Sequence, residues 1–89
     1  MQKIEKIIII YEENHGVIGV AVDLKSAIYW LIETDWINAH TNFWVDKKWQ
    51  TVEKLFGEHW REILVEQEEE FFEGSFYFDE KDLIGAIYD

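Results

Sequence analysis

The pattern of hydrophobic and polar positions predicts a β-hairpin at the start of the chain. Lys3–Tyr11 holds an almost unbroken run of β-branched isoleucines, which is typical of a central strand buried on both faces. The polar stretch Glu12–Gly16 follows, and its asparagine and glycine can adopt the positive φ of a tight turn. Val17–Val22 then returns as a second strand, in which Gly19 marks a bulge or a close-packing point.

Apolar residues at helical spacing predict a helix from Leu24 to about Thr34. They recur at i, i+3, i+4 and i+7, which places them on one stripe of an amphipathic helix. Asp23 precedes the stripe, and its carboxylate can accept an unpaired backbone N–H as an N-cap. Trp36–Thr41 favours a loop, and Phe43–Val45 a short strand.

A second helical pattern begins between Asp46 and Thr51. The apolar residues that keep its spacing are Val52, Phe56, Trp60 and Ile63. Gly57 interrupts this pattern, and glycine costs about 1 kcal/mol relative to alanine inside a helix. Either one helix bends at Gly57, or Gly57 ends a short helix and another begins near His59.

The segment that follows allows two interpretations. Glu66–Glu70 continues the helix, or Ile63–Phe72 forms a strand. Glu73–Ser75 carries a turn signal in either case.

The end of the chain predicts a strand at Phe76–Phe78, because aromatic residues favour strands. The spacing of Asp79 and Asp82 is typical of a helix N-terminus, so Leu83–Tyr88 is either a short helix or a strand. The whole pattern predicts one small α+β domain over residues 1–89, with an N-terminal antiparallel β-hairpin packed by two or three helices and a C-terminal strand.

Composition excludes several classes of function. Eight Lys and Arg against nineteen Asp and Glu give a net charge of -11, which disfavours direct binding to nucleic acid or to an anionic membrane. The absence of cysteine excludes disulfides, thiolate nucleophiles and cysteine-based metal sites. The longest apolar run, Ile7–Tyr11, is too short for a signal-peptide core or a membrane span, so we expect a cytoplasmic protein.

Catalytic and metal-binding signatures are weak. Ser26 and Ser75 are the two serines, and neither lies in a nucleophile motif; no phosphate-binding or dinucleotide glycine pattern occurs. His59, Glu62 and Glu66 share one face of a helix, but a solvated face explains them better than a metal site. We expect a protein that is not an enzyme and that holds no cofactor and no metal.

Two further functions stay open as alternatives. Lys47 and Lys48 lie beside Trp44 and Trp49, which is a pattern that can stack a base, and Arg61 can bind a phosphate. These residues would suit a small-ligand or signalling-nucleotide binding module. The large number of aromatic residues would also suit a structural subunit of a larger assembly.

The five tryptophans divide into two groups. Trp30 and Trp60 lie in or beside helical stripes, which indicates core positions. Trp36, Trp44 and Trp49 bracket a predicted loop and are either core residues or exposed anchors of an interface.

Negative charge is concentrated in the last third of the chain. Ten carboxylates between Glu62 and Asp89 face a single lysine there, so this segment carries -9 of the total of -11. On a helix such carboxylates lie about 5–6 Å apart, which is comparable with neighbouring phosphates of nucleic acid. They form either a solvated face that aids solubility or a surface that occupies a basic nucleic-acid-binding site on another protein. The residues that we expect to bind such a partner are Glu66, Glu68, Glu69, Glu70, Glu73, Asp79, Glu80 and Asp82, with an aromatic anchor from Trp36, Trp44 or Trp49.

The chain resembles the small acidic inhibitors encoded by phages and mobile elements, including proteins of the anti-CRISPR type. The resemblance lies in its brevity, its lack of cysteine and its acidic segment from Glu66–Glu70 to Asp82. It implies binding to a CRISPR nuclease where that enzyme reads duplex DNA with arginines. The expected function is therefore non-enzymatic inhibition by an acidic, DNA-mimic-like surface.

Overall fold

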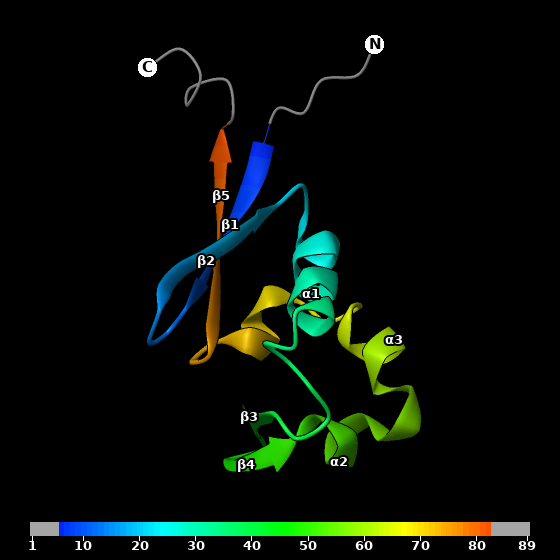
Figure 1. Cartoon of the computed structure of the whole chain (residues 1–89). Helices are drawn as coiled ribbons and strands as arrows, with labels where there is room; N and C mark the ends of the chain where they lie inside the picture. The colour runs from blue at the N-terminus through cyan, green and yellow to red at the C-terminus, as the bar shows by residue number, and fades with distance from the viewer. Residues whose placement is uncertain (1–5, 83–89) are drawn as a thin grey trace.

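A three-stranded antiparallel sheet forms the upper part of the molecule in Figure 1. The computed structural model describes residues 6–82 of the chain. The sheet contains β1 (Lys6–Glu12), β2 (Gly16–Ala21) and β5 (Phe76–Asp82) in the order β2-β1-β5, so β1 is the central strand. The predicted N-terminal hairpin and the predicted strand at Phe76–Phe78 are confirmed.

The turn between β1 and β2 is built by local hydrogen bonds. The carboxylate of Glu12 accepts the backbone N–H of Asn14 at 2.8 Å and contacts Nδ1 of His15 at 2.6 Å. The hydrogen bond with His15 is the main reason why the pKa of Glu12 is lowered. Gly16 supplies the positive φ of 74° that closes the turn.

Residues 6–82 fully bury only one face of β1. Ile8 and Ile10 point into the core, whereas Ile7 and Ile9 point to the other face and are half-buried. Within residues 6–82 the expectation of a strand buried on both faces is therefore not met, because α1 and η2 lie on one face of the sheet and no described element covers the other.

Helix α1 (Leu24–Glu33) packs across the hairpin as its apolar stripe predicts. Asp23 accepts the backbone N–H of Ser26 at 2.7 Å, which confirms the N-cap. Gly19 of β2 lies under the ring of Trp30, where a Cβ atom at position 19 would come within 2.8 Å of the ring. The ladder between β1 and β2 also shifts register beside Gly19, so this glycine marks both a bulge and a close approach.

A second hairpin follows α1 and the loop that was predicted at residues 36–41. It consists of β3 (Asn42–Val45) and β4 (Lys48–Thr51). The short strand at Phe43–Val45 is confirmed. The helix expected to start between Asp46 and Thr51 starts at the end of this range, where Thr51 caps it, and residues 46–50 belong to the hairpin. Asp46 and Lys47 both have positive φ, 54° and 64°, and form the two-residue turn that joins the strands.

Gly57 ends the first of two short helices. This confirms the alternative in which a second helix begins near His59, and not that of one bent helix. Helix α2 (Val52–Phe56) begins at a Thr51 cap and ends at Gly57, where φ is 79°. A 3-10 turn, η1 (Gly57–His59), then leads into α3 (Trp60–Leu64).

The segment after α3 forms neither the extended helix nor the strand that the sequence allowed. It turns at residues 65–67 and then forms the 3-10 helix η2 (Glu69–Phe72). The turn expected at Glu73–Ser75 is confirmed, with Gly74 at a φ of 89°. The helix start expected at Asp79 and Asp82 is wrong, because β5 continues through both residues; Leu83–Tyr88 lies outside the described residues.

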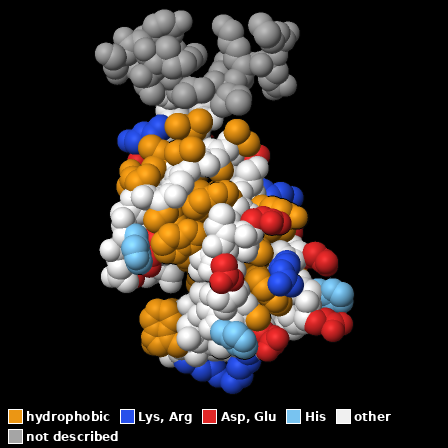
Figure 2. Space-filling model, viewed as in Figure 1, with side chains coloured by type: hydrophobic (Ala, Val, Ile, Leu, Met, Phe, Trp, Pro, Cys, Tyr) orange, Lys and Arg blue, Asp and Glu red, His pale blue; other side chains and the backbone are white. Residues whose placement is uncertain are grey.

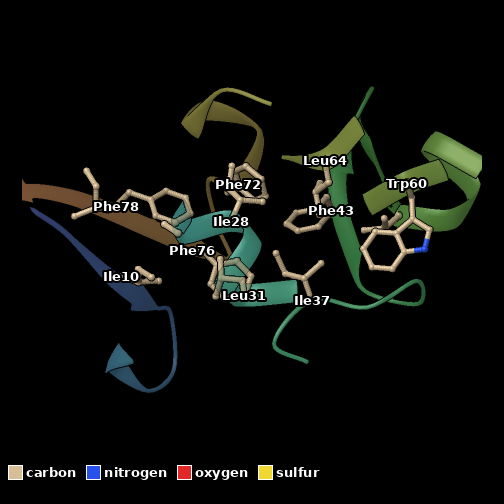
Figure 3. Packing of buried hydrophobic residues seen from close by; sticks show 13 residues of the cluster. Ile10, Ile28, Leu31, Ile37, Phe43, Trp60, Leu64, Phe72, Phe76 and Phe78 are labelled. Carbon is tan, nitrogen blue, oxygen red and sulfur yellow. The ribbon is translucent and has the colours of Figure 1, made fainter. Parts of the chain in front are cut away.

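The core runs as one continuous row of side chains from the sheet to α3 (Figure 3). Phe76 and Phe78 of β5 meet Ile28 and Leu31 of α1, and Phe72 links these to hairpin β3–β4. The predicted α+β class is confirmed, and the order of hairpin, helices and C-terminal strand agrees with the expectation in outline. No helix within residues 6–82 is long and apolar enough to span a lipid bilayer.

Candidate protein-binding surfaces

The acidic turn, which we define as Glu66–Glu73, is held in place by two phenylalanines. The ring of Phe72 is fully buried, 5.6 Å from the ring of Phe43 and 5.6 Å from that of Phe78. Phe71 packs 4.9 Å from the same Phe43 ring. Since Phe72 is buried and Phe71 packs on the core, the backbone between α3 and β5 has a defined path and its glutamates face solvent. The exposed glutamates of η2 and its flanks are Glu68, Glu69, Glu70 and Glu73.

These four glutamates have no cationic neighbour. Among residues 6–82, no lysine, arginine or histidine nitrogen lies within 4.0 Å of their carboxylates. Glu66 differs, because it forms an ion pair of 2.9 Å with Lys25 of α1. The turn therefore presents four uncompensated negative charges over six consecutive residues.

The three acidic residues of β5 are divided between the two faces of the sheet. Asp79 lies on one face, 3.2 Å from Lys81, and this neighbour raises the pKa of Lys81. Glu80 and Asp82 lie on the other face, where Glu80 contacts Lys6 at 3.4 Å. The eight predicted carboxylates thus do not share one helical face, and the helical spacing assumed for them is wrong.

One hollow nevertheless brings part of the acidic turn next to β5. Glu69 lines this hollow together with Asp79, Glu80 and the capping residue Asp23. Glu69 of η2 and Glu80 of β5 therefore line the same hollow near the first turn of α1.

Two of the three candidate aromatic anchors are exposed. Trp44 and Trp49 lie directly opposite each other on β3 and β4, with their rings 5.4 Å apart, and 55% and 58% of their surfaces are exposed. Trp36 is half-buried against the core and contacts the ring of His15. The sequence allowed either core or interface positions for these tryptophans, and the structure places Trp44 and Trp49 at the surface.

The tryptophan pair and the acidic turn do not form one surface. Side chains alternate along β3, so Trp44 projects from the face of the hairpin opposite to Phe43. Phe43 is the residue that packs on η2. In Figure 2, hydrophobic and lysine side chains lie together at the lower end of the molecule, where Figure 1 shows hairpin β3–β4.

The predicted phosphate contact of Arg61 and the predicted metal-binding residues gain little from the geometry. Arg61 stacks over the ring of Trp60 at 4.5 Å and shares a hollow with Glu62 and Glu66, which would repel a phosphate. His59 has Glu62 at 3.7 Å, but both side chains are exposed, and within residues 6–82 no group of three or more acidic or histidine residues is arranged to hold a metal ion.

A third surface was missed by the sequence interpretation. We define the open face as the side of the three-stranded sheet that α1 and η2 leave uncovered; its residues are Ile7, Ile9, Tyr11, Val17, Val20, Tyr77, Asp79 and Lys81. Val17, Val20 and Tyr77 are each about 60% exposed, at 59%, 59% and 63%. The unbroken apolar run of β1 was a signal for this face, since such a strand carries apolar side chains on both sides.

Comparison with family models, with curated proteins and with solved structures found no match for this chain.

Proposed function

We propose that this protein is a non-enzymatic inhibitor that binds a basic nucleic-acid-binding site on another protein through the acidic turn. The observation that carries the proposal is the set of four uncompensated glutamates on η2 and its flanks: Glu68, Glu69, Glu70 and Glu73. A CRISPR nuclease is the partner that we propose to test first, because its duplex-binding site is lined with arginines. A phage or mobile element is the source that such an inhibitor implies.

The anchoring of the turn supports this role. A flexible acidic tail would lose conformational entropy on binding, whereas a turn fixed by Phe71 and Phe72 has already lost that freedom on folding. Arginine also pairs with carboxylates in a bidentate manner, and such pairs need carboxylates that are not already neutralised. The turn meets both conditions.

The uneven distribution of charge over the molecule also supports binding to a basic site. The hollow at the start of α1 brings Glu69 of η2 beside Glu80 of β5 and Asp23, so carboxylates beyond η2 border the acidic turn. A field of this sign accelerates encounter with a basic groove and keeps nucleic acid away from it. The proposed inhibition therefore requires occupation of the groove and no chemical step.

Competition for DNA tests the proposal. Purified guide-loaded CRISPR nuclease is mixed with labelled duplex target, and fluorescence anisotropy follows release of the duplex as this protein is added. We expect the wild type to displace the duplex and to do so less well at high salt. The variant E68Q/E69Q/E70Q/E73Q should lose about tenfold or more in apparent affinity, because each lost charge-assisted hydrogen bond contributes about 1.5–3 kcal/mol.

A matched variant separates the acidic turn from net charge. The variant E33Q/E53Q/E58Q/E62Q also removes four exposed carboxylates but leaves the acidic turn intact. It should displace the duplex nearly as well as the wild type. Equal loss in both variants would show that total charge and not the turn is responsible, and failure of the wild type against a panel of such nucleases would overturn the proposed inhibition.

A further inference from the structure

The open face of the sheet is unusual for a surface in contact with water. An antiparallel sheet with one solvated face normally alternates apolar and polar side chains, so that polar ones face water. Here β2 presents Val17 and Val20, and β1 presents Ile7 and Ile9. The rings of Tyr11 and Tyr77 lie 5.6 Å apart beside them. This face has the composition of a sheet that packs on another layer.

The open face is also a neutral surface on an acidic molecule. Within the three described strands it carries one carboxylate, Asp79, and Lys81 neutralises it at 3.2 Å. The other charged residues of these strands lie on the covered face or at the turn; they are Lys6, Glu12, Glu80 and Asp82. The chain as a whole carries -11.

The charge distribution of the molecule favours a second copy of this chain as the partner that covers the open face. A basic partner would be drawn to the acidic turn, which is elsewhere on the molecule, and gains no electrostatic attraction from a neutral apolar sheet. Two copies of this chain repel each other over most of their surfaces, but not where both surfaces are neutral. An approach through the two open faces keeps the acidic turns away from the contact and buries apolar area on both sides.

We infer that two copies of this chain form a homodimer by packing their open faces together. The result is a sandwich of two three-stranded sheets, each covered on its outer side by α1 and η2, with the symmetric contact typical of two-fold dimers. Ile7 and Ile9 become fully buried in it. The isoleucine run of β1 then has the burial on both faces that its sequence is typical of, and Asp79 of one copy can pair with Lys81 of the other.

Sedimentation velocity of the full chain tests this dimer. We expect the wild type to pass from the monomer mass of 10.7 kDa toward twice that value as concentration rises. Raising the salt concentration from about 50 mM to about 500 mM should tighten the dimer, because it screens repulsion between the acidic copies. Binding of the acidic turn to a basic partner has the opposite salt dependence.

Lysine substitutions locate the interface. Y77K and V20K each place a charge in the open face and should weaken dimerisation about tenfold or more, as expected when a central interface residue is lost. Both changes make the molecule less acidic, so general charge repulsion cannot explain a weaker dimer. The matched control is Y29K on α1, where Tyr29 is 58% exposed against 63% for Tyr77; it should dimerise like the wild type.

Several outcomes would overturn the inference. A wild type that stays monomeric up to about 300 µM, a range that detects even weak association, would do so. So would a dimer that survives both Y77K and V20K with circular dichroism like that of the wild type, or one that Y29K disrupts equally. If the wild type is monomeric and a chain ending at Asp82 dimerises, residues 83–89 cover the face instead. The quadruple glutamine variant of the acidic turn should still dimerise, which separates this inference from the proposed inhibition.

Discussion

At the scale of single residues, Asp23 determines where α1 begins. Its backbone is extended, with φ at -154°, so the chain changes direction at this position and the helix starts at the next residue. Its carboxylate accepts the backbone N–H of Ser26, and this bond is the main reason why the pKa of Asp23 is lowered. The carboxylate is therefore more favourable in the folded state than in the unfolded chain.

Removal of this cap should destabilise the protein. We expect D23A to lower the free energy of unfolding by about 1 kcal/mol, which urea denaturation at neutral pH measures. D23N is the matched control, because asparagine caps helices nearly as well as aspartate and should retain most of the stability.

The same cap predicts a dependence on pH. Because the folded pKa of Asp23 lies below its usual value of 3.8, its contribution is complete above that value and is lost as pH falls through the folded pKa. Stability of D23N should therefore fall less steeply than that of the wild type below about pH 4. Parallel curves for the two proteins would contradict the role assigned to the charge.

At the scale of elements, hairpin β3–β4 shows why part of the fold could not be predicted from the sequence. Its turn uses Asp46 and Lys47 at positive φ, positions where glycine or asparagine would have signalled a turn. The strand signal in β4 is equally weak, since its four residues do not alternate in hydrophobicity. Cross-strand packing of Trp44 against Trp49 and burial of Phe43 stabilise this hairpin, although the turn and strand preferences of its residues do not predict it.

Lys47 should accordingly be a site where stability can be gained. A non-glycine residue in the left-handed region costs about 1–2 kcal/mol, and part of this cost disappears with glycine. We expect K47G to raise the free energy of unfolding by about 0.5–1 kcal/mol. K48G, one residue further into β4, should lower it instead, because glycine weakens a strand.

The sequence was more informative for the other elements. The β1–β2 hairpin, α1 and its cap, and the break at Gly57 each rest on local signals that the structure confirms. The residues after α3 were ambiguous, because the sequence of this glutamate-rich segment was compatible with either a helix or a strand. Their path depends on two adjacent phenylalanines that both contact the core from a tight 3-10 turn.

The candidate surfaces were predictable as residues but not as geometry. The charge of Glu68–Glu70 and the tryptophans near position 45 could be identified in the chain, yet their separation onto different surfaces depends on which way β3 faces. The open face exists because no described element covers that side of the sheet, and a local sequence pattern does not predict where other elements pack.

At the scale of the whole molecule, charge opposes compactness. Nineteen carboxylates against eight basic residues repel each other across a molecule whose longest extent is 45 Å over the described residues. The four glutamates of the acidic turn contribute most locally, since none has a cationic neighbour within residues 6–82. The turn is therefore costly for folding, which agrees with the binding role that we propose for it.

Salt should therefore stabilise this protein. We expect the urea midpoint to rise between about 20 mM and about 500 mM sodium chloride, because the Debye length shortens severalfold over this range. The variant E68Q/E69Q/E70Q/E73Q should be more stable than the wild type at low salt and should respond less to salt. A wild type whose stability is independent of salt would show that the charges are too well hydrated to matter.

The pairing of β1 with β5 has a consequence for the order of folding. Lys6 of β1 pairs with Asp82 of β5, at the two ends of the described chain. The central strand β1 can therefore pair with β5 only after most of the intervening residues have folded. Hairpin β1–β2 needs only a short loop and can form early, whereas closure of such a long loop is slow. Until β5 arrives, the isoleucine strand has one bare edge, and such edges pair with other chains. Refolding should thus be most prone to aggregation before the acidic turn reaches its place, which makes that turn a late marker of the native state.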